Sequence, residues 1–174
     1  MIKALVTSLF LGAVSLVSAQ QINPLTVPED LENQQRWVDS VYGSMSLQEK
    51  IGQLFMVDVF SSDSQAKIDK VNALIDDYYI GGVIFSKGGP MRQAKLNNEF
   101  QERSKLPLMI GMDAEWGLAM RLDSTFAYPW NMTLGAIQDD RIVELVGKRI
   151  GEHSKRLGVH INFAPVIDIN TNPK

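Results

Sequence analysis

The sequence contains no cysteine, and histidine is almost absent, with His153 and His160 the two examples in 174 residues. Without cysteine, the chain cannot form disulfides, thiolate nucleophiles, cysteine-bound zinc sites or a lipid anchor on an N-terminal cysteine. Two histidines are too few for a histidine-rich metal site. We therefore expect neither a metal nor another cofactor.

The sequence also lacks an excess of positive charge. Lysine and arginine together number 17 against 20 acidic residues, which gives a formal net charge of -3. The basic residues are scattered along the chain instead of forming a block, which is typical of solvated helix faces. Nucleic acid is therefore not an expected partner. The hydrophobic share of 45% is that of an ordinary globular protein.

The longest apolar stretch lies at the N-terminus and is too short to span a membrane comfortably. Lys3 precedes an apolar segment, residues 4–16, and Val17-Ser18-Ala19 has the pattern of a cleavage signal. We expect residues 1–19 to be a secretory signal peptide and the mature protein to have no stable membrane insertion. An uncleaved anchor is the alternative. A secreted protein without cysteine fits a bacterial periplasm or the cell exterior.

Residues 20–45 are expected to form an arm, with prolines at 24 and 28, followed by a short helix over residues 33–42. The main domain is then expected to occupy residues 46–174. At its start, Ser46 and Glu49 have the spacing of a capping box, in which each side chain bonds the other residue's backbone at a helix N-terminus.

Apolar runs and amphipathic segments alternate through the rest of the chain. Strands are expected at 54–59, 83–85, the run from Leu106 to Asp113, and 159–169. Helices are expected over 68–78, 90–104 and 140–157. Such alternation predicts the α/β fold class, with a parallel sheet and right-handed crossovers.

Two architectures compete, an open doubly wound sheet and a TIM-type (β/α)8 barrel. No glycine-rich nucleotide-binding signature follows any of the strands, which removes the main support for the open sheet. A barrel takes about 250 residues, and residues 46–174 supply about half of that. We therefore expect a truncated barrel that contains the first four strand–helix units.

The polar residues that follow the third and fourth strands are the first candidates for a functional site. Asp113 and Glu115 follow the third strand, and Asp168 lies near the end of the fourth. In parallel α/β folds, ligands bind at the carboxyl ends of the strands. A carboxylate that caps a local turn is the alternative reading of Asp113.

Four segments, taken in order, resemble the catalytic barrel of glycoside hydrolase family 3. They are residues 45–54, 81–85, 107–113 and 162–168. The segment Asp113-Ala114-Glu115-Trp116-Gly117 is more similar to the bacterial β-N-acetylglucosaminidases of the family, although Trp116 stands where those enzymes have a first glycine.

The resemblance implies an exo-acting, retaining glycoside hydrolase that removes terminal β-linked sugars, such as a β-N-acetylhexosaminidase. The substrate would be a glycan or a muropeptide-type saccharide. In the family, the residue that matches Asp113 binds hydroxyls of the terminal sugar, and the one that matches Arg121 also contacts it. Glu115 and Asp168 are further candidates for substrate binding.

No catalytic residue is assigned in this chain, because the family's nucleophile and acid/base lie on later segments, beyond Lys174. The chain alone is therefore expected to be inactive. The alternatives are a β-glucosidase or β-xylosidase of the same family, and a non-catalytic sugar-binding remnant.

Several side chains in this region have competing interpretations. Arg121 could simply form a salt bridge with a neighbouring carboxylate, and Glu115 could orient Arg121 or face water. Trp116 and Trp130 could stack on a sugar ring, but core packing is the favoured prediction for Trp130. His153 is expected in the core, and His160 is expected to be structural, at the opposite edge of the sheet.

Overall fold

The computed structural model describes residues 30–166, so the expected signal peptide and Asp168 lie outside the described residues. The chain divides into two compact units, residues 1–43 and 44–174. In the first unit, the described structure is helix α1 (Leu31–Ser44), which buries none of its side chains. This confirms the short helix expected over residues 33–42.

The second unit is built around a parallel sheet of four strands. They are β1 (Met56–Phe60), β2 (Gly82–Lys87), β3 (Met109–Met112) and β4 (Ile161–Asn162). They lie in the order β1-β2-β3-β4, and each pairs in parallel with the next. A doubly wound sheet reverses its order at a switch point, whereas a barrel adds its strands in sequence. The predicted α/β fold with barrel-type strand order is therefore confirmed.

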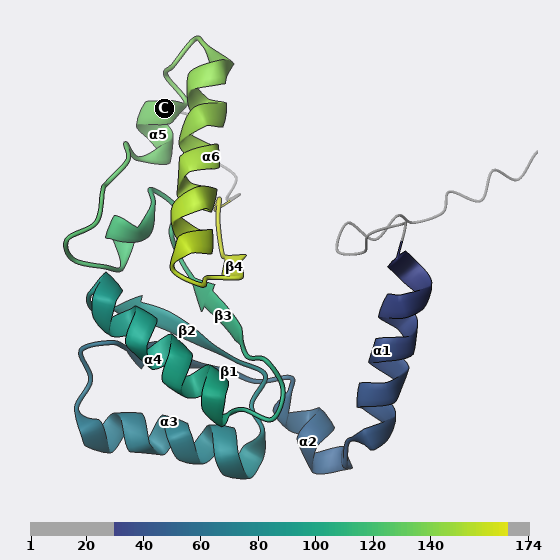
Figure 1. The fold of residues 1–174 in the computed structure, drawn as a ribbon. Coiled ribbons are helices and arrows are strands. Elements are labelled where there is room, and N and C mark those ends of the chain that lie inside the picture. Colours follow the sequence, from purple (N-terminus) through teal and green to yellow (C-terminus); the bar gives the residue numbers. More distant parts are fainter. Residues whose placement is uncertain (1–29, 167–174) are drawn as a thin grey trace, which may run out of the picture. The chain divides into compact units, whose positions relative to one another are not determined.

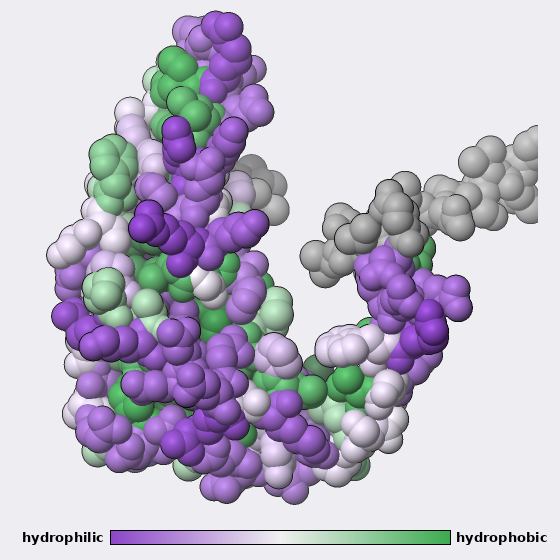
Figure 2. All heavy atoms as spheres, viewed as in Figure 1, coloured by the Kyte–Doolittle hydropathy of each residue, from purple (hydrophilic) through white to green (hydrophobic). Residues whose placement is uncertain are grey.

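Helices α3 (Gln65–Tyr78) and α4 (Pro90–Arg103) lie side by side against the sheet (Figure 1). The core between the helices and the strands is apolar. Its central members are Val59, Ile68, Val71, Ile75, Val83, Phe85, Phe100, Ile110 and Met112. The outward surfaces of α3 and α4 are mainly hydrophilic, as expected for amphipathic helices (Figure 2).

The inward faces of these helices differ in part from the prediction. Tyr78 has the helical spacing of the inward apolar residues of α3 and is therefore predicted to face inward, but it is 57% exposed at the end of the helix. In α4, the same kind of spacing predicts Ala94, Leu96 and Phe100 inward. Phe100 is buried and Leu96 is partly buried against the core, as predicted, but the buried polar residues Gln93 and Asn97 were not predicted. The Asn97 side chain can be buried because its Nδ2 donates a hydrogen bond of 2.9 Å to the carbonyl of Leu157.

A long connection joins β3 to β4. It contains the 3-10 turn η2 (Leu118–Met120) and helices α5 (Asn131–Leu134) and α6 (Asp140–Arg156). Asp139 and Asp140 are both candidates for the N-cap of α6 from the sequence, and the structure shows that Asp139 caps the helix by accepting a hydrogen bond from the backbone N–H of Arg141 at 3.1 Å. None of the helices in residues 30–166 is long and apolar enough to cross a membrane.

Two predictions for this region are wrong. The helical spacing of Ile142, Val146 and Ile150 predicts that Ile142 faces inward, but it is 48% exposed, because the first half of α6 extends beyond β3 and β4 (Figure 1). The fourth strand was expected over residues 159–169, but β4 has only two residues. Its pairing with β3 stops where β3 itself ends, at Met112.

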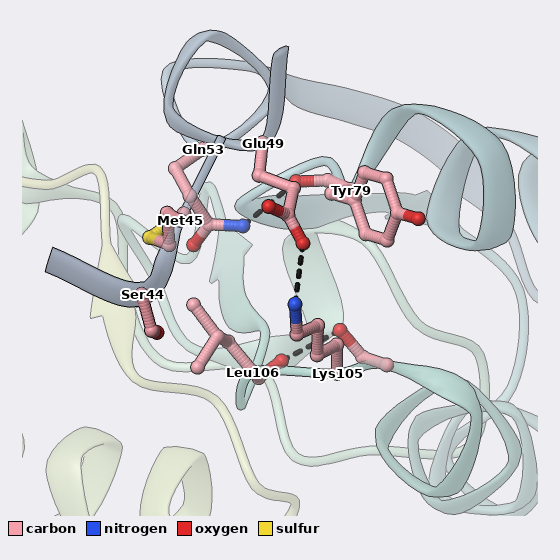
Figure 3. A pocket seen from close by; sticks show the side chains of 8 residues that line it. Ser44, Met45, Glu49, Gln53, Tyr79, Lys105 and Leu106 are labelled. Atoms are coloured by element: carbon pink, nitrogen blue, oxygen red, sulfur yellow. Dashed lines mark hydrogen bonds and ion pairs between the residues drawn. The ribbon is translucent and has the colours of Figure 1, made fainter. Parts of the chain in front are cut away.

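The segments that precede β1, β2 and β3 meet around a cavity of about 20 Å³, which is room for roughly one water molecule (Figure 3). Here the predicted capping box of α2 (Leu47–Gly52) is confirmed: Ser46 N–H donates to Glu49 at 2.7 Å, and Glu49 N–H donates to Ser46 Oγ at 3.3 Å. Lys105 Nζ lies 2.5 Å from Glu49 Oε1. The capping box and the Glu49–Lys105 ion pair therefore stabilise the N-terminal side of the sheet, away from the edge where ligands are expected.

Glu49→Gln is predicted to destabilise the protein in a pH-dependent way. The Lys105 side chain and the Ser46 backbone and hydroxyl lower the pKa of Glu49 from 4.5 to about 2. A lowered carboxyl pKa adds stability that is fully present above pH 4.5 and is lost as the pH falls toward 2. Urea unfolding should therefore show wild type more stable than Glu49→Gln at pH 7, with a smaller difference at pH 3.

The exposed Glu144 of α6 provides a matched control for this experiment. Glu144→Gln is expected to unfold like wild type at both pH values. An equal difference between wild type and Glu49→Gln at pH 7 and pH 3 would show that ionisation of Glu49 does not stabilise the fold.

Candidate functional site

An ion pair lies at the carboxyl end of β3. Asp113 directly follows the strand, and its Oδ2 lies 2.5 Å from Nη2 of Arg121. The two side chains are 31% and 28% exposed, so each is partly buried but still reaches the surface. The structure thus brings together the two residues that the sequence singled out for sugar binding, and the salt bridge that was the alternative reading of Arg121 is also present.

The position of Arg121 is set by the turn after β2. Gly88 N–H donates to the carbonyl of Arg121 at 3.2 Å, and the carbonyl of Gly88 accepts from the N–H of Asp123 at 2.8 Å. Gly88 has a φ of 135°, a conformation that favours glycine. Burial of Leu118 and Leu122 fixes the same segment from the apolar side. The backbone of Arg121 is therefore held on both sides.

Ser61 in turn fixes the position of this Gly88–Gly89 segment, a role that its sequence context does not indicate. Its hydroxyl accepts a hydrogen bond from the N–H of Gly89 at 2.9 Å and donates to the carbonyl of Gly89 at 3.2 Å. Ser61 is buried just past the end of β1. The adjacent glycines at 88 and 89 are the one sequence signal that could have indicated a close contact here.

Asn162 fixes the segment that carries Asp113, which its sequence context does not indicate either. Its Oδ1 accepts from the N–H of Ala114 at 2.9 Å, and its Nδ2 donates to the carbonyl of Ala114 at 3.4 Å. The amide thereby connects the ends of β4 and β3. Because Ala114 follows Asp113 directly, Asn162 positions the candidate site without being part of it.

Asn162→Ala is predicted to weaken substrate binding by the full-length gene product. Two hydrogen bonds with a net value of about 1 kcal/mol each correspond to an increase in KM of up to roughly 30-fold, with a smaller change in kcat. Kinetics on an aryl β-glycoside would measure both. Asn98→Ala, at an exposed position of α4, is the control and should leave KM unchanged. A lower melting temperature with unaltered KM would mean that Asn162 has a purely structural role.

Glu115 does not make the contact with Arg121 that was considered. Its Oε2 instead lies 3.5 Å from Nδ2 of Asn131, at the start of α5, while the guanidinium pairs with Asp113. Asp168, the remaining candidate, lies outside the described residues.

The two histidines have structural contacts. His160 Nδ1 accepts from the N–H of Ile110 at 3.0 Å, where β4 joins the start of β3. His153 is half-buried in α6, with its ring centroid 6.0 Å from that of Tyr128. The structural role predicted for His160 is confirmed, whereas His153 is only half-buried and lies outside the apolar core, so the prediction that it is a core residue is wrong. Within residues 30–166, no group of three His, Cys, Asp or Glu side chains is arranged to hold a metal ion.

The two tryptophans of the β3–α6 connection form a pair. The ring centroids of Trp116 and Trp130 are 5.9 Å apart, and the planes are tilted by 47°. Trp130 is 67% exposed, so the prediction that it packs in the core is wrong. The physical reason is that the short helix α5 buries Leu134 instead, which leaves the residue before the helix outside.

These residues together can bind a polar ligand at the carboxyl edge of the sheet. A carboxylate accepts hydrogen bonds from hydroxyl groups, and a guanidinium donates them, and charge-assisted bonds of this kind are short and directional. Described residues alone do not supply a complete set of groups for bond cleavage. The arrangement is suited to binding a polar ligand at the carboxyl edge of the sheet.

Comparison with known proteins agrees with this architecture. A sequence profile of the Glycosyl hydrolase family 3 N terminal domain matches residues 46–174. The chain is 33% identical to "Beta-hexosaminidase A" of Pseudoalteromonas piscicida over 60% of this chain and 20% of that protein. It is 27% identical to the "Beta-N-acetylglucosaminidase/beta-glucosidase" of Cellulomonas fimi over 78% of this chain and 23% of that protein.

A solved structure, "Beta-glucoside phosphorylase BglX bound to 2FGlc", has the same fold with a TM-score of 0.73 and 24% identity, over 82% of this chain and 25% of that one. The chain thus spans about a fifth to a quarter of the length of these proteins. Since the profile covers nearly the whole of the second unit, the chain belongs to glycoside hydrolase family 3 and corresponds to part of its N-terminal barrel domain.

Proposed function

We propose that the protein containing this chain is an exo-acting, retaining glycoside hydrolase, and that it removes terminal β-linked N-acetylglucosamine from a glycan or a muropeptide-type saccharide. The observation that carries the proposal is the Asp113–Arg121 pair, partly exposed at the carboxyl edge of a barrel-type sheet. The names of two relatives, a β-hexosaminidase and a β-N-acetylglucosaminidase/β-glucosidase, support the substrate class.

In this proposal, the described residues bind and orient the terminal sugar. The carboxylate of Asp113 accepts hydrogen bonds from two neighbouring hydroxyls, and Arg121 holds the carboxylate in place while it donates its remaining N–H groups to the sugar. Arg121 Nε is buried and has no hydrogen-bond partner among the described residues, so it is a donor still to be satisfied.

Retention of configuration needs a carboxylate nucleophile and a proton donor for the leaving oxygen. We assign neither role to a described residue. Asp113 is committed to hydroxyl binding by its ion pair with Arg121, and Glu115 has its contact with Asn131.

We also propose that residues 1–19 are a cleaved signal peptide and that residues 20–45 are an arm and helix in front of the barrel domain. The support is the charged residue, apolar segment and small-residue cleavage signal in the sequence. The protein would then act in a bacterial periplasm or outside the cell, where cell-wall and chitin-type fragments occur.

Hydrolysis of two aryl glycosides by the full-length gene product tests the proposed function. We expect kcat/KM for the β-N-acetylglucosaminide to exceed that for the β-glucoside by at least about tenfold, a ratio equal to 1.4 kcal/mol of transition-state discrimination. Cleavage of the glucoside alone would contradict the proposal and favour the second candidate, a β-glucosidase. That candidate has support from the double name of the Cellulomonas fimi relative. Saccharide binding without cleavage of either would indicate a non-catalytic sugar-binding protein.

A further inference from the structure

The exposed tryptophan pair has no role in the function proposed so far. Trp130 is 67% exposed, although burial of an indole ring is strongly favourable. Trp116, its partner, is only partly exposed. A large aromatic side chain that is held in place yet left open to solvent is typical of a surface that binds a ligand.

The pair is held in a fixed position. The N–H of Tyr128 donates to the carbonyl of Trp116 at 3.0 Å, which ties the two ends of the loop together. The ring of Tyr128 packs edge-on against Phe126 and closely over Gly117, the residue after Trp116. On the other side, the carbonyl of Trp130 accepts from the N–H groups of Thr133 and Leu134 in the turn of α5. The indole rings are therefore presented on an ordered backbone.

The pair lies close to the candidate sugar-binding residues. Trp116 comes three positions after Asp113. With consecutive Cα atoms 3.8 Å apart, the Cα atoms of these two residues cannot be separated by more than about 11 Å. Trp116 therefore lies close to Asp113 along the backbone that follows β3, at the carboxyl edge of the sheet.

Polar groups border the aromatic surface. Glu115 Oε2 and Asn131 Nδ2, one residue from each tryptophan along the chain, lie 3.5 Å apart. This separation makes at best a weak hydrogen bond, so both groups retain capacity for other partners. A flat apolar surface with hydrogen-bonding groups at its border matches a pyranose ring, which has an apolar face of C–H groups and a rim of hydroxyls. A purely apolar partner would make no use of the remaining hydrogen-bonding capacity of Glu115 and Asn131.

We propose that Trp116 and Trp130, bordered by Glu115 and Asn131, form a second saccharide subsite. It takes the sugar next to the terminal residue bound at Asp113, by stacking of the pyranose face on the exposed indole of Trp130. This inference rests on the proposed function, because it assumes that Asp113 binds the terminal sugar.

Calorimetric titration of the full-length gene product with two ligands tests the subsite. The ligands are N-acetylglucosamine and an S-linked N,N′-diacetylchitobiose, which resists hydrolysis. Stacking of one sugar ring is expected to contribute enough for the disaccharide to bind about tenfold more tightly than the monosaccharide, since tenfold is 1.4 kcal/mol. Trp130→Ala should reduce this ratio to below about threefold and leave the monosaccharide affinity unchanged.

Met132→Ala is the matched control, because Met132 is 90% exposed in the same segment and does not belong to the Trp116–Trp130 pair. It should retain the tenfold ratio, and Trp130→Phe should retain part of it. Equal affinities of wild type for the two ligands, or an unchanged ratio in Trp130→Ala, would overturn the subsite while leaving the proposed function intact. An equal loss in Met132→Ala would overturn it as well. Failure of wild type to bind either ligand would instead contradict the proposed function itself.

Discussion

Replacement of Asp113 by asparagine is expected to lower kcat/KM of the full-length gene product by at least about 100-fold. Two hydrogen bonds from sugar hydroxyls to a carboxylate are worth about 1.5–3 kcal/mol each, and each 1.4 kcal/mol is a factor of ten. Asparagine retains the shape of the side chain but removes the charge, and it offers one acceptor oxygen in place of two.

The ion pair adds to this effect. In wild type, Arg121 Nη2 lies 2.5 Å from Asp113 Oδ2. In Asp113→Asn, the guanidinium is no longer balanced by a carboxylate, and the alignment of both groups is lost. We therefore expect a loss of affinity for N-acetylglucosamine itself, measurable by calorimetry, as well as the loss of kcat/KM.

Asp123→Asn is the control for this prediction. Asp123 lies on the same connection and is also paired with an arginine, with Oδ2 3.0 Å from Nη2 of Arg92, but its side chain is 59% exposed. Exposed ion pairs contribute little, so this variant should keep kcat/KM within about threefold of wild type. A similar result for Asp113→Asn would show that the candidate site is not the sugar site.

Gly88→Val is expected to have the second largest effect, on both stability and activity. Valine at a φ of 135° is strained, and a Cβ at this position would lie 1.9 Å from Ser61 Oγ. Backbone strain of this kind costs about 1–3 kcal/mol, to which the clash adds. The hydroxyl of Ser61 must move, and its hydrogen bonds with Gly89 are lost.

The activity loss follows from the bonds of Gly88 to the segment that carries Arg121. Gly88 N–H donates to the carbonyl of Arg121, and the carbonyl of Gly88 accepts from Asp123. A shift of this turn displaces Arg121 from Asp113, and misplacement of about 1 Å in a site can cost 100-fold in rate. Thermal unfolding and kinetics on an aryl β-glycoside would measure the two effects.

Gly147→Ala is the matched control, because nothing lies within 4 Å of the Cβ that the substitution adds in α6. Alanine in a helix is expected to stabilise by about 0.5–1 kcal/mol relative to glycine, without a change in activity. If Gly88→Val retained wild-type kinetics with only a lower melting temperature, the turn would not position Arg121.

Local sequence signals predicted most of the fold. The capping box at Ser46 and Glu49, the N-cap at Asp139 and the apolar runs of β1 to β3 depend on residues a few positions apart, and each was correctly recognised. The extent of β4 was not predictable in this way. Strand length depends on where the neighbouring strand stops, and β3 ends at Met112.

The hydrogen bonds that fix the candidate site could not be predicted from the sequence, because they join residues that are far apart along the chain. Asn162 bonds Ala114 across 48 residues, and Ser61 bonds Gly89 across 28. Neither polar residue has a local pattern that distinguishes it from a surface side chain. Trp130 was misjudged because hydrophobicity alone does not reveal which face of a short helix is buried.

A crystal structure of the full-length gene product with bound N-acetylglucosamine would show directly whether Asp113 and Arg121 bind the terminal sugar. We expect two sugar hydroxyls within about 3 Å of the Asp113 carboxylate oxygens, with Arg121 in contact with the same sugar. A terminal sugar bound elsewhere, without a contact to an unchanged Asp113–Arg121 pair, would show that these residues do not form the sugar site.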